Sequence, residues 1–80
     1  MGVLNKNNNG VCTIWTYGNE YKDFEVGDWC GGEGYSGLTD GVDVRGFITK
    51  IDVGFDSVTI WSDKLDMPCD IKLRSLYHID

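Results

Sequence analysis

Eighty residues are enough for one domain and too few for two. An apolar fraction of 41%, with 3 tryptophans, 4 tyrosines and 3 phenylalanines, predicts one compact core, while 11 glycines against 1 proline predict many turns. The formal net charge of −6 repels phosphate groups, so it argues against general binding to nucleic acid or to anionic membranes.

The three cysteines, Cys12, Cys30 and Cys69, form neither a CxxC pair nor a regular disulfide framework. The first residues lack the basic and apolar regions of a signal peptide, and no apolar run approaches the ~18 residues of a membrane span. We therefore expect reduced and mostly buried thiols in a cytoplasmic protein that does not enter a membrane. One disulfide with a leftover thiol is the alternative.

The first half of the chain predicts short extended segments separated by turns. Residues 1–10 are dominated by asparagine, which predicts a flexible N-terminal arm before a single domain over residues 11–80. The β-branched and aromatic residues of segment 11–18 predict a strand. In segment 24–30 the alternation of Phe24 and Val26 predicts the next strand, and Gly27-Asp28 predicts a turn-like entry into Trp29 and Cys30. Five glycines in segment 31–41 predict a long irregular loop.

The second half of the chain has more regular patterns. Residues 42–53 and 57–63 predict two successive strands. In segment 69–74 every second residue is apolar, which predicts a half-buried strand. Residues 74–76 suit a single 3-10 turn, and residues 77–79 predict a short closing strand.

The alternation also predicts which side chains form the core. Val58, Ile60, Ile71 and Leu73 should lie on the inward faces of adjacent strands. Gly46 interrupts the longest predicted strand and indicates a bulge or bend. No segment of useful length has apolar residues at helical spacing, so we expect an all-β protein.

The order of these segments has a known counterpart. FEVGDW opens a strand before the glycine-rich loop, RGFITKID leads through a turn into DSVTIWSD, and CDIKLRSLYHID supplies the last strand, a turn and a closing strand. From residue 24 to residue 80 this order resembles the SH3-like barrels, the broad class of SH3 and KOW modules. The resemblance implies a small all-β SH3-like barrel of about five or six strands with a short 3-10 turn near the C-terminus.

Two narrower families share fewer features with the chain. True SH3 domains bind proline-rich peptides through an ALYDY-type loop, which is absent here, although RSLY places Ser75 and Tyr77 near the closing turn of that family. The type II dihydrofolate reductases resemble this chain in the opening FEVGD at residues 24–28. Their pore segment corresponds to residues 70–73 here, without the glutamine and tyrosine that contact the ligand.

Residues that could carry catalysis or bind metal are sparse in the sequence. The only histidine, His78, lies next to the chain end, where a general base lacks an evident partner and pocket. No Cys/His ligands stand at the short spacing of zinc sites, and the aspartates near residues 40–43 and 63–70 lack calcium-loop spacing. The glycine-rich run is no P-loop. We predict no catalytic residue, no metal site and no cofactor.

Large aromatic side chains remain as the candidates for function. They are favoured at protein interfaces because they bury much area with few rotatable bonds. Trp29 and Trp61 could simply fill the barrel, whereas the tyrosines lie in turn-rich contexts that favour exposure. In SH3-like barrels the long first loop and the 3-10 turn form a groove. Tyr35 falls in that loop and Tyr77 directly after that turn, so the groove would bring these two tyrosines together. We predict a binding surface made of Tyr17, Tyr21, Trp29, Tyr35 and Tyr77, with Asp40 and Asp43 as its charged rim.

These observations favour a non-catalytic protein-binding module, a small acidic adaptor or inhibitor whose partner presents a basic or amphipathic surface. The size and acidity also suit a phage or mobile-element accessory protein that acts on a bacterial protein. One alternative is an oligomeric enzyme resembling the type II dihydrofolate reductases, with its site at a symmetry axis. The other is a KOW-type nucleic-acid module, which predicts salt-sensitive binding to RNA or DNA.

Overall fold

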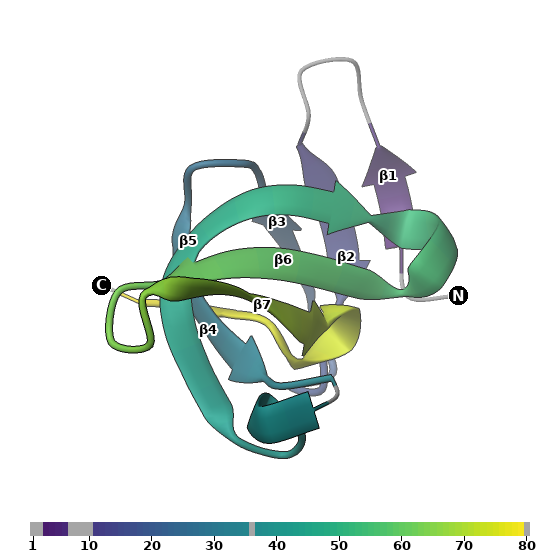
Figure 1. Cartoon of the computed structure of the whole chain (residues 1–80). Coiled ribbons are helices and arrows are strands. Elements are labelled where there is room, and N and C mark those ends of the chain that lie inside the picture. Colours follow the sequence, from purple (N-terminus) through teal and green to yellow (C-terminus); the bar gives the residue numbers. More distant parts are fainter. Residues whose placement is uncertain (1–2, 7–10, 36, 80) are drawn as a thin grey trace.

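The computed structural model describes residues 3–6, 11–35 and 37–79. Strands and 3-10 turns are the only regular elements in these ranges, so the predicted all-β class is confirmed (Figure 1). No helix among the described residues has the length and apolar character needed to cross a membrane. The elements are β1 (Val3–Lys6), β2 (Cys12–Trp15), β3 (Tyr21–Phe24), β4 (Trp29–Glu33), η1 (Gly37–Thr39), β5 (Asp43–Asp52), η2 (Val53–Phe55), β6 (Ser57–Ser62), β7 (Met67–Lys72), η3 (Leu73–Ser75) and β8 (Tyr77–His78).

The strands form two antiparallel sheets. One has three strands in the order β1-β2-β3, and the other has five in the order β7-β6-β5-β4-β8. The long strand β5 curves strongly, so that the five-stranded sheet wraps around one side of the core (Figure 1). The two sheets are not joined into one closed ladder within the described residues, and membership of the SH3-like class stays a prediction.

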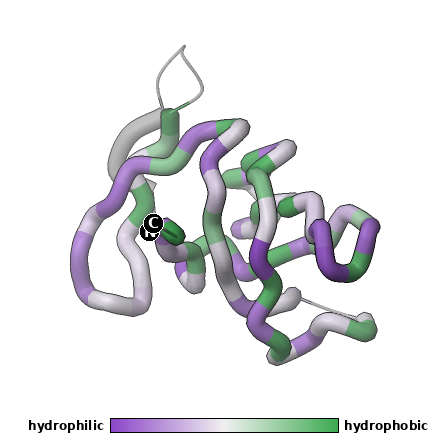
Figure 2. Tube along the Cα trace, turned by 90° about the vertical axis from the view of Figure 1, so that its left-hand side faces the viewer, coloured by the Kyte–Doolittle hydropathy of each residue, from purple (hydrophilic) through white to green (hydrophobic). Residues whose placement is uncertain are grey.

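Alternation along the strands places the core as predicted. Val58, Ile60, Ile71 and Leu73 are all buried, since each occupies an inward position of β6, β7 or η3. Polar and apolar residues follow one another along the trace in Figure 2, as expected for sheets with one solvated face. The three-stranded sheet completes the same core with three further buried side chains, Cys12, Ile14 and Phe24.

Residues 3–6 differ from the predicted flexible arm. They form strand β1, which pairs antiparallel with β2 from Val3 opposite Ile14 to Lys6 opposite Cys12. Backbone N–H and C=O groups make such a ladder, so an asparagine-rich segment does not prevent it. The rest of the predicted arm, residues 1–2 and 7–10, lies outside the described residues.

A turn separates β3 from β4 close to where Gly27 and Asp28 predicted one, but the strand predicted for Phe24 and Val26 already ends at Phe24. Phe24 ends β3 and Trp29 begins β4, with a turn between them. The Asp28 carboxylate accepts a hydrogen bond from the Glu25 backbone N–H at 3.0 Å, which closes this turn. A side-chain bond of this kind gives the backbone an alternative to a continuous ladder.

The glycine-rich segment 31–41 is also more regular than predicted, because β4 continues through its first three residues. A Cβ atom at Gly31 would lie 2.5 Å from the ring of Tyr77, closer than real Cβ contacts. A side chain at this position would displace the Tyr77 ring, so the glycine lets that ring lie against β4. The loop that follows β4 contains the 3-10 turn η1.

Gly46 marks a second close approach within β5. A Cβ atom at this position would lie 1.8 Å from the carbonyl oxygen of Trp61 in β6. The irregularity of the ladder predicted for Gly46 falls two residues later, between Ile48 and Lys50. The glycine thus brings β5 and β6 together, and the neighbouring register shift bends the sheet.

The C-terminal segment connects the two sheets. The predicted 3-10 turn is present as η3, one residue earlier than expected. Arg74 in this turn donates from Nε to the Trp15 carbonyl at 3.1 Å, and its own carbonyl accepts from Tyr17 N–H at 2.9 Å. His78 Nε2 lies 2.7 Å from the Asp23 carbonyl of β3, so the last residues bind to both ends of the three-stranded sheet.

The core predicts a simple stability experiment. Replacing Ile60 or Ile71 by alanine should destabilise the fold by roughly 2–5 kcal/mol, because each fully buried side chain leaves a cavity. The matched control is Leu38→Ala, at a side chain that is 95% exposed, which should change stability by less than about 0.5 kcal/mol. Urea unfolding followed by tryptophan fluorescence measures all three. Equal midpoints for the three variants would contradict the inward placement of these isoleucines.

Candidate functional site

A row of aromatic side chains crosses the solvent side of the five-stranded sheet. Trp29 in β4 is directly opposite Phe47 in β5, and Phe47 is directly opposite Trp61 in β6. The rings of Trp29 and Phe47 meet edge to face, with centroids 4.6 Å apart. Phe47 is 45% exposed and Trp61 is 39% exposed, although the next residue of β5, Ile48, is buried. The row therefore faces solvent.

Tyr77 in β8 lies on the same side of the sheet, beside this row and not in line with it. Its backbone is opposite Gly31 of β4, and its ring lies against that glycine. The Tyr77 hydroxyl donates a hydrogen bond of 2.6 Å to Asp43, whose other oxygen accepts from Arg45 Nε at 3.1 Å. Burial, together with the hydrogen bond to Asp43, raises the pKa of Tyr77 above its ordinary value. We call Trp29, Phe47, Trp61 and Tyr77 the outer aromatic face.

Two hollows lie beside the outer aromatic face and share Asp43 in their walls. The larger, about 510 Å³, lies between Trp29, Val42 and Leu65 and is mostly apolar. The smaller, about 290 Å³, joins Tyr17 and Tyr77 across the end of η3. Because one carboxylate borders both, the two hollows are neighbouring parts of one surface.

The second hollow matches the predicted groove between the long loop and the 3-10 turn. Ser75 of η3 and Gly41 of the loop both line it. The Ser75 hydroxyl accepts from the Glu33 N–H at 2.8 Å and so fixes the turn against β4. Lys72 forms an ion pair of 2.7 Å with the Glu33 carboxylate at the same place. The hydrogen-bonded ion pair with Glu33 raises the pKa of Lys72. In the same way, the hydrogen bond from Arg45 to Asp43 raises the pKa of Arg45.

The structure brings together four of the seven predicted binding residues. Trp29, Asp43 and Tyr77 belong to the outer aromatic face or its rim, and Tyr17 lines the adjoining smaller hollow. Tyr21 lies on the three-stranded sheet, where its ring packs edge to face on Trp15 at 4.9 Å.

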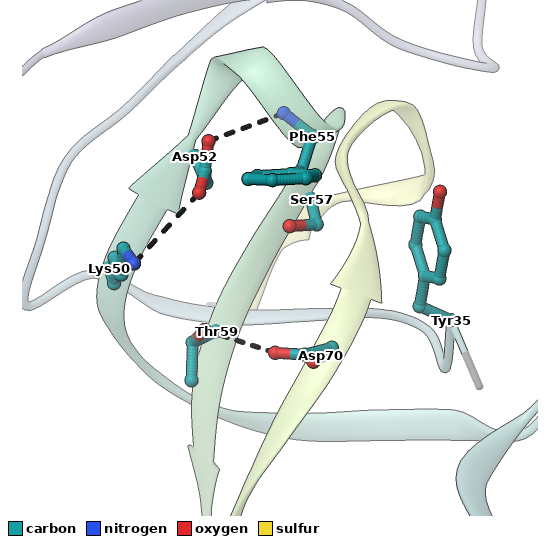
Figure 3. A pocket seen from close by; sticks show the side chains of 7 residues that line it. All are labelled: Tyr35, Lys50, Asp52, Phe55, Ser57, Thr59 and Asp70. Atoms are coloured by element: carbon teal, nitrogen blue, oxygen red, sulfur yellow. Dashed lines mark hydrogen bonds and ion pairs between the residues drawn. The ribbon is translucent and has the colours of Figure 1, made fainter. Parts of the chain in front are cut away.

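The other two predicted residues lie in or next to the loop after β4. Asp40 is exposed in the turn that follows η1 and forms an isolated bridge with Gly34. Tyr35 lines a third hollow of about 360 Å³ together with Phe55 and Asp70 (Figure 3). Tyr77, its expected partner in the predicted groove, lines the smaller hollow with Tyr17 instead. The expected pairing of Tyr35 with Tyr77 in one groove is therefore not what the structure has.

The polar walls of the third hollow are largely bonded to one another. The Asp52 carboxylate accepts from Phe55 N–H at 3.2 Å and lies 3.9 Å from Lys50 Nζ (Figure 3). Thr59 donates to Asp70 at 3.2 Å across β6 and β7. These internal bonds support the β5–β6 turn and the sheet edge, so the hollow offers fewer groups to a ligand than its residues suggest.

Sequence reasoning missed Phe47 and Trp61 as members of the surface. The signal was present, because Trp61 alternates with the core residue Ile60 and must face the opposite side of β6. The same alternation in β5 separates Phe47 from Ile48. Applying the period of two to aromatic as well as aliphatic residues would have found both.

A second cluster of chemically capable groups lies on the core side of β4. Asp28, Cys30 and His78 each direct one ligand atom to a common region, and these atoms lie within 4.8 Å of one another. Burial, with a contribution from the Asp28 carboxylate, raises the pKa of the Cys30 thiol to about 12. Burial likewise raises the pKa of Cys69. All three cysteines are buried, as the sequence predicted.

The outer aromatic face and the Asp28–Cys30–His78 cluster lie on opposite sides of the same strand, since Trp29 and Cys30 are consecutive residues of β4. The sequence predicted no metal site, because no cysteine and histidine stand at the short spacing of zinc sites. Comparison of the chain with protein-family models, curated proteins and solved structures gave no match.

The hydrogen bond from Tyr77 to Asp43 predicts a stability difference that depends on pH. A tyrosine whose pKa is raised by folding stabilises the native state below its ordinary pKa of about 10 and loses that contribution as the pH rises through the native value. Wild type should exceed Tyr77→Phe in stability by less than about 1 kcal/mol at pH 8, because the bond is solvent-exposed.

Urea unfolding of both proteins at several values between about pH 8 and pH 11 measures this difference. It should stay constant up to about pH 10 and then narrow. Groups common to both proteins cancel in the comparison. A difference that stays constant over the whole range would contradict the role of the Tyr77 proton.

Proposed function

We propose that this chain is a non-catalytic protein-binding module that contacts its partner through the outer aromatic face. The observation that carries the proposal is the row Trp29, Phe47 and Trp61, in direct register across three strands on the solvent side. Aromatic side chains of this kind are the commonest energetic centres of protein interfaces. Their fixed positions on strands keep the entropy lost on binding low.

The composition of this face is unusual for an antiparallel sheet with one side on the core. The solvent side of such a sheet normally carries polar residues. Here three large rings and Tyr77 occupy it, and the apolar hollow beside Trp29 adds Val42 and Leu65. Contiguous apolar surface on a small domain favours a docking role over a purely structural one.

The charges favour a partner with an apolar strip and basic flanks. Close to the face, Asp43 is balanced by Arg45 at 3.1 Å. The excess of negative charge belongs to the whole domain, with a net charge of −6. Such a field steers a basic partner toward the protein and increases the association rate, while the rings supply most of the contact area.

We further propose that the module acts as a small acidic adaptor or inhibitor in a reducing compartment such as the cytoplasm. The buried free thiols of Cys30 and Cys69 support this location, because thiols persist where disulfides are kept reduced. The phage or mobile-element origin suggested by size and acidity stays part of this proposal. The corresponding expectation is that the partner is a bacterial protein.

Comparative capture tests the proposal. The full chain and its Phe47→Ala/Trp61→Ala variant serve as baits in a bacterial lysate, and bound proteins are quantified by mass spectrometry. The matched control bait is Phe55→Ala, which removes an exposed aromatic ring from the separate third hollow. We expect a partner that is retained by wild type and by the control and is lost from the outer-face variant.

Titration with the purified partner then measures how much each ring contributes to the binding free energy. Phe47→Ala and Trp61→Ala should each weaken binding by more than about 1 kcal/mol, whereas Phe55→Ala should leave it nearly unchanged. Thermal melting verifies that the variants remain folded. A partner bound equally by all baits would contradict the assignment of this face. Salt-sensitive binding of oligonucleotides would favour the KOW-type alternative, and saturable tryptophan quenching by dihydrofolate and a nicotinamide cofactor would favour the reductase.

A further inference from the structure

Cys30 and His78 are brought together by strand pairing. They are 48 residues apart in the sequence and directly opposite in the β4–β8 ladder, so their side chains share one face. The Cys30 sulfur lies 3.8 Å from Nδ1 of His78. A carboxylate oxygen of Asp28, two residues before Cys30, completes a triangle whose atoms lie within 4.8 Å of one another.

The surroundings of His78 leave Nδ1 as an electron-pair donor. Its Nε2 lies 2.7 Å from the Asp23 carbonyl oxygen, which can only accept a hydrogen bond, so Nε2 carries the proton of the neutral ring. The ring also stacks on Phe24, with centroids 4.3 Å apart and planes inclined by 15°. A histidine that donates its second N–H to a backbone carbonyl is the usual arrangement of a metal ligand.

The Asp28 carboxylate is held in place by its own turn. Its Oδ2 accepts the Glu25 N–H at 3.0 Å, and the Asp28 backbone carbonyl accepts from Ile48 N–H at 3.0 Å. Asp28 is half-buried, Cys30 is buried and His78 is exposed, so the triangle opens toward solvent on one side. Three donors on the protein side with one open side suit a metal that keeps a water ligand.

We propose that Asp28, Cys30 and His78 form a zinc-binding site, with water as the fourth ligand. Sulfur, imidazole nitrogen and carboxylate oxygen are the three donor types that zinc takes in proteins. Zinc bond lengths of about 2.0–2.3 Å in a tetrahedron place ligand atoms roughly 3.3–3.6 Å apart. The sulfur–nitrogen distance of 3.8 Å is already close to this, and the Asp28 oxygen lies within 4.8 Å of both atoms. Binding releases the thiol proton of Cys30 to solvent.

The other chemistry open to a cysteine–histidine–aspartate set is nucleophilic attack, and the position of Cys30 disfavours it. The sulfur is fully buried, so no surface beside it can seat a substrate, whereas a single ion can bind between the three ligand atoms from the open side. A reactive cysteine needs an exposed thiolate in an electropositive environment, whereas Asp28 places negative charge beside this thiol. For zinc binding the negative charge of Asp28 is favourable, because the carboxylate attracts and ligates the Zn²⁺ ion.

The site is independent of the proposed protein-binding function and goes beyond it. Cys30 faces the core side of β4, while Trp29 faces the outer aromatic face. Zinc would connect the β3–β4 turn, β4 and β8, three segments that otherwise meet through backbone bonds and the His78 ring. Metal binding to the native state alone therefore raises the stability of the fold.

Cobalt titration of the reduced full chain tests the site, because Co²⁺ replaces Zn²⁺ and gives a visible spectrum. We expect a saturable thiolate-to-cobalt charge-transfer band that one equivalent of Zn²⁺ abolishes. Cys30→Ala should lose the band, and Asp28→Asn should weaken cobalt affinity at least about ten-fold. The matched control is Cys69→Ala, a buried thiol in β7 outside the triangle, which should keep the band.

Zinc should also raise the melting temperature of wild type and of Cys69→Ala, and leave that of Cys30→Ala unchanged. Circular dichroism verifies the fold of each variant, and Asp28→Asn serves if Cys30→Ala does not fold. A folded wild-type protein without a saturable charge-transfer band would overturn the proposal and leave a plain thiol–imidazole contact. A band that persists in Cys30→Ala would overturn it too, since the thiolate would then come from another cysteine.

Discussion

The pairing of β8 with β4 is the contact on which both candidate sites depend. It consists of only two residue pairs, Cys30 with His78 and Gly31 with Tyr77. Because successive side chains of a strand point to opposite sides, these two pairs send His78 toward the core side and Tyr77 toward solvent. One short ladder thus supplies the last ring of the outer aromatic face and the imidazole of the proposed zinc site.

The same segment also connects the two sheets, which share no ladder among the described residues. Arg74 binds the carbonyl of Trp15 at the end of β2, and His78 lies on Phe24 at the end of β3. An 80-residue domain buries a limited apolar area, so a few such cross-sheet contacts are a large part of what orients one sheet on the other. Loosening the C-terminal residues would therefore affect both sites and the core together.

Local pattern was sufficient for the parts of the fold that depend on alternation. The period of two in β6 and β7 correctly predicted Ile60 and Ile71 in the core, and the absence of helical spacing predicted the all-β class. Local pattern was insufficient where the position of a residue depends on contacts with a strand far away in the sequence. Gly31 was interpreted as a loop residue, because no neighbouring residue in the sequence indicates that the Tyr77 ring lies against it. The contact between Cys30 and His78 was missed for the same reason, since their separation resembles no metal-binding spacing.

The close approach at Gly31 also explains how so short a ladder can keep its register. A slip of β8 by one residue would exchange the two faces, placing the Tyr77 ring on the core side of β4 and His78 on the outer side. Trp29, Gly31 and Glu33 occupy the outward positions of β4. Of these three, only Gly31 has no side chain, so the Tyr77 ring fits against β4 at that position. The Tyr77 hydroxyl then reaches Asp43 at 2.6 Å, which adds a second fixed point. The position of Tyr77 on the outer aromatic face and that of His78 beside Cys30 therefore depend on the same register of β8 on β4.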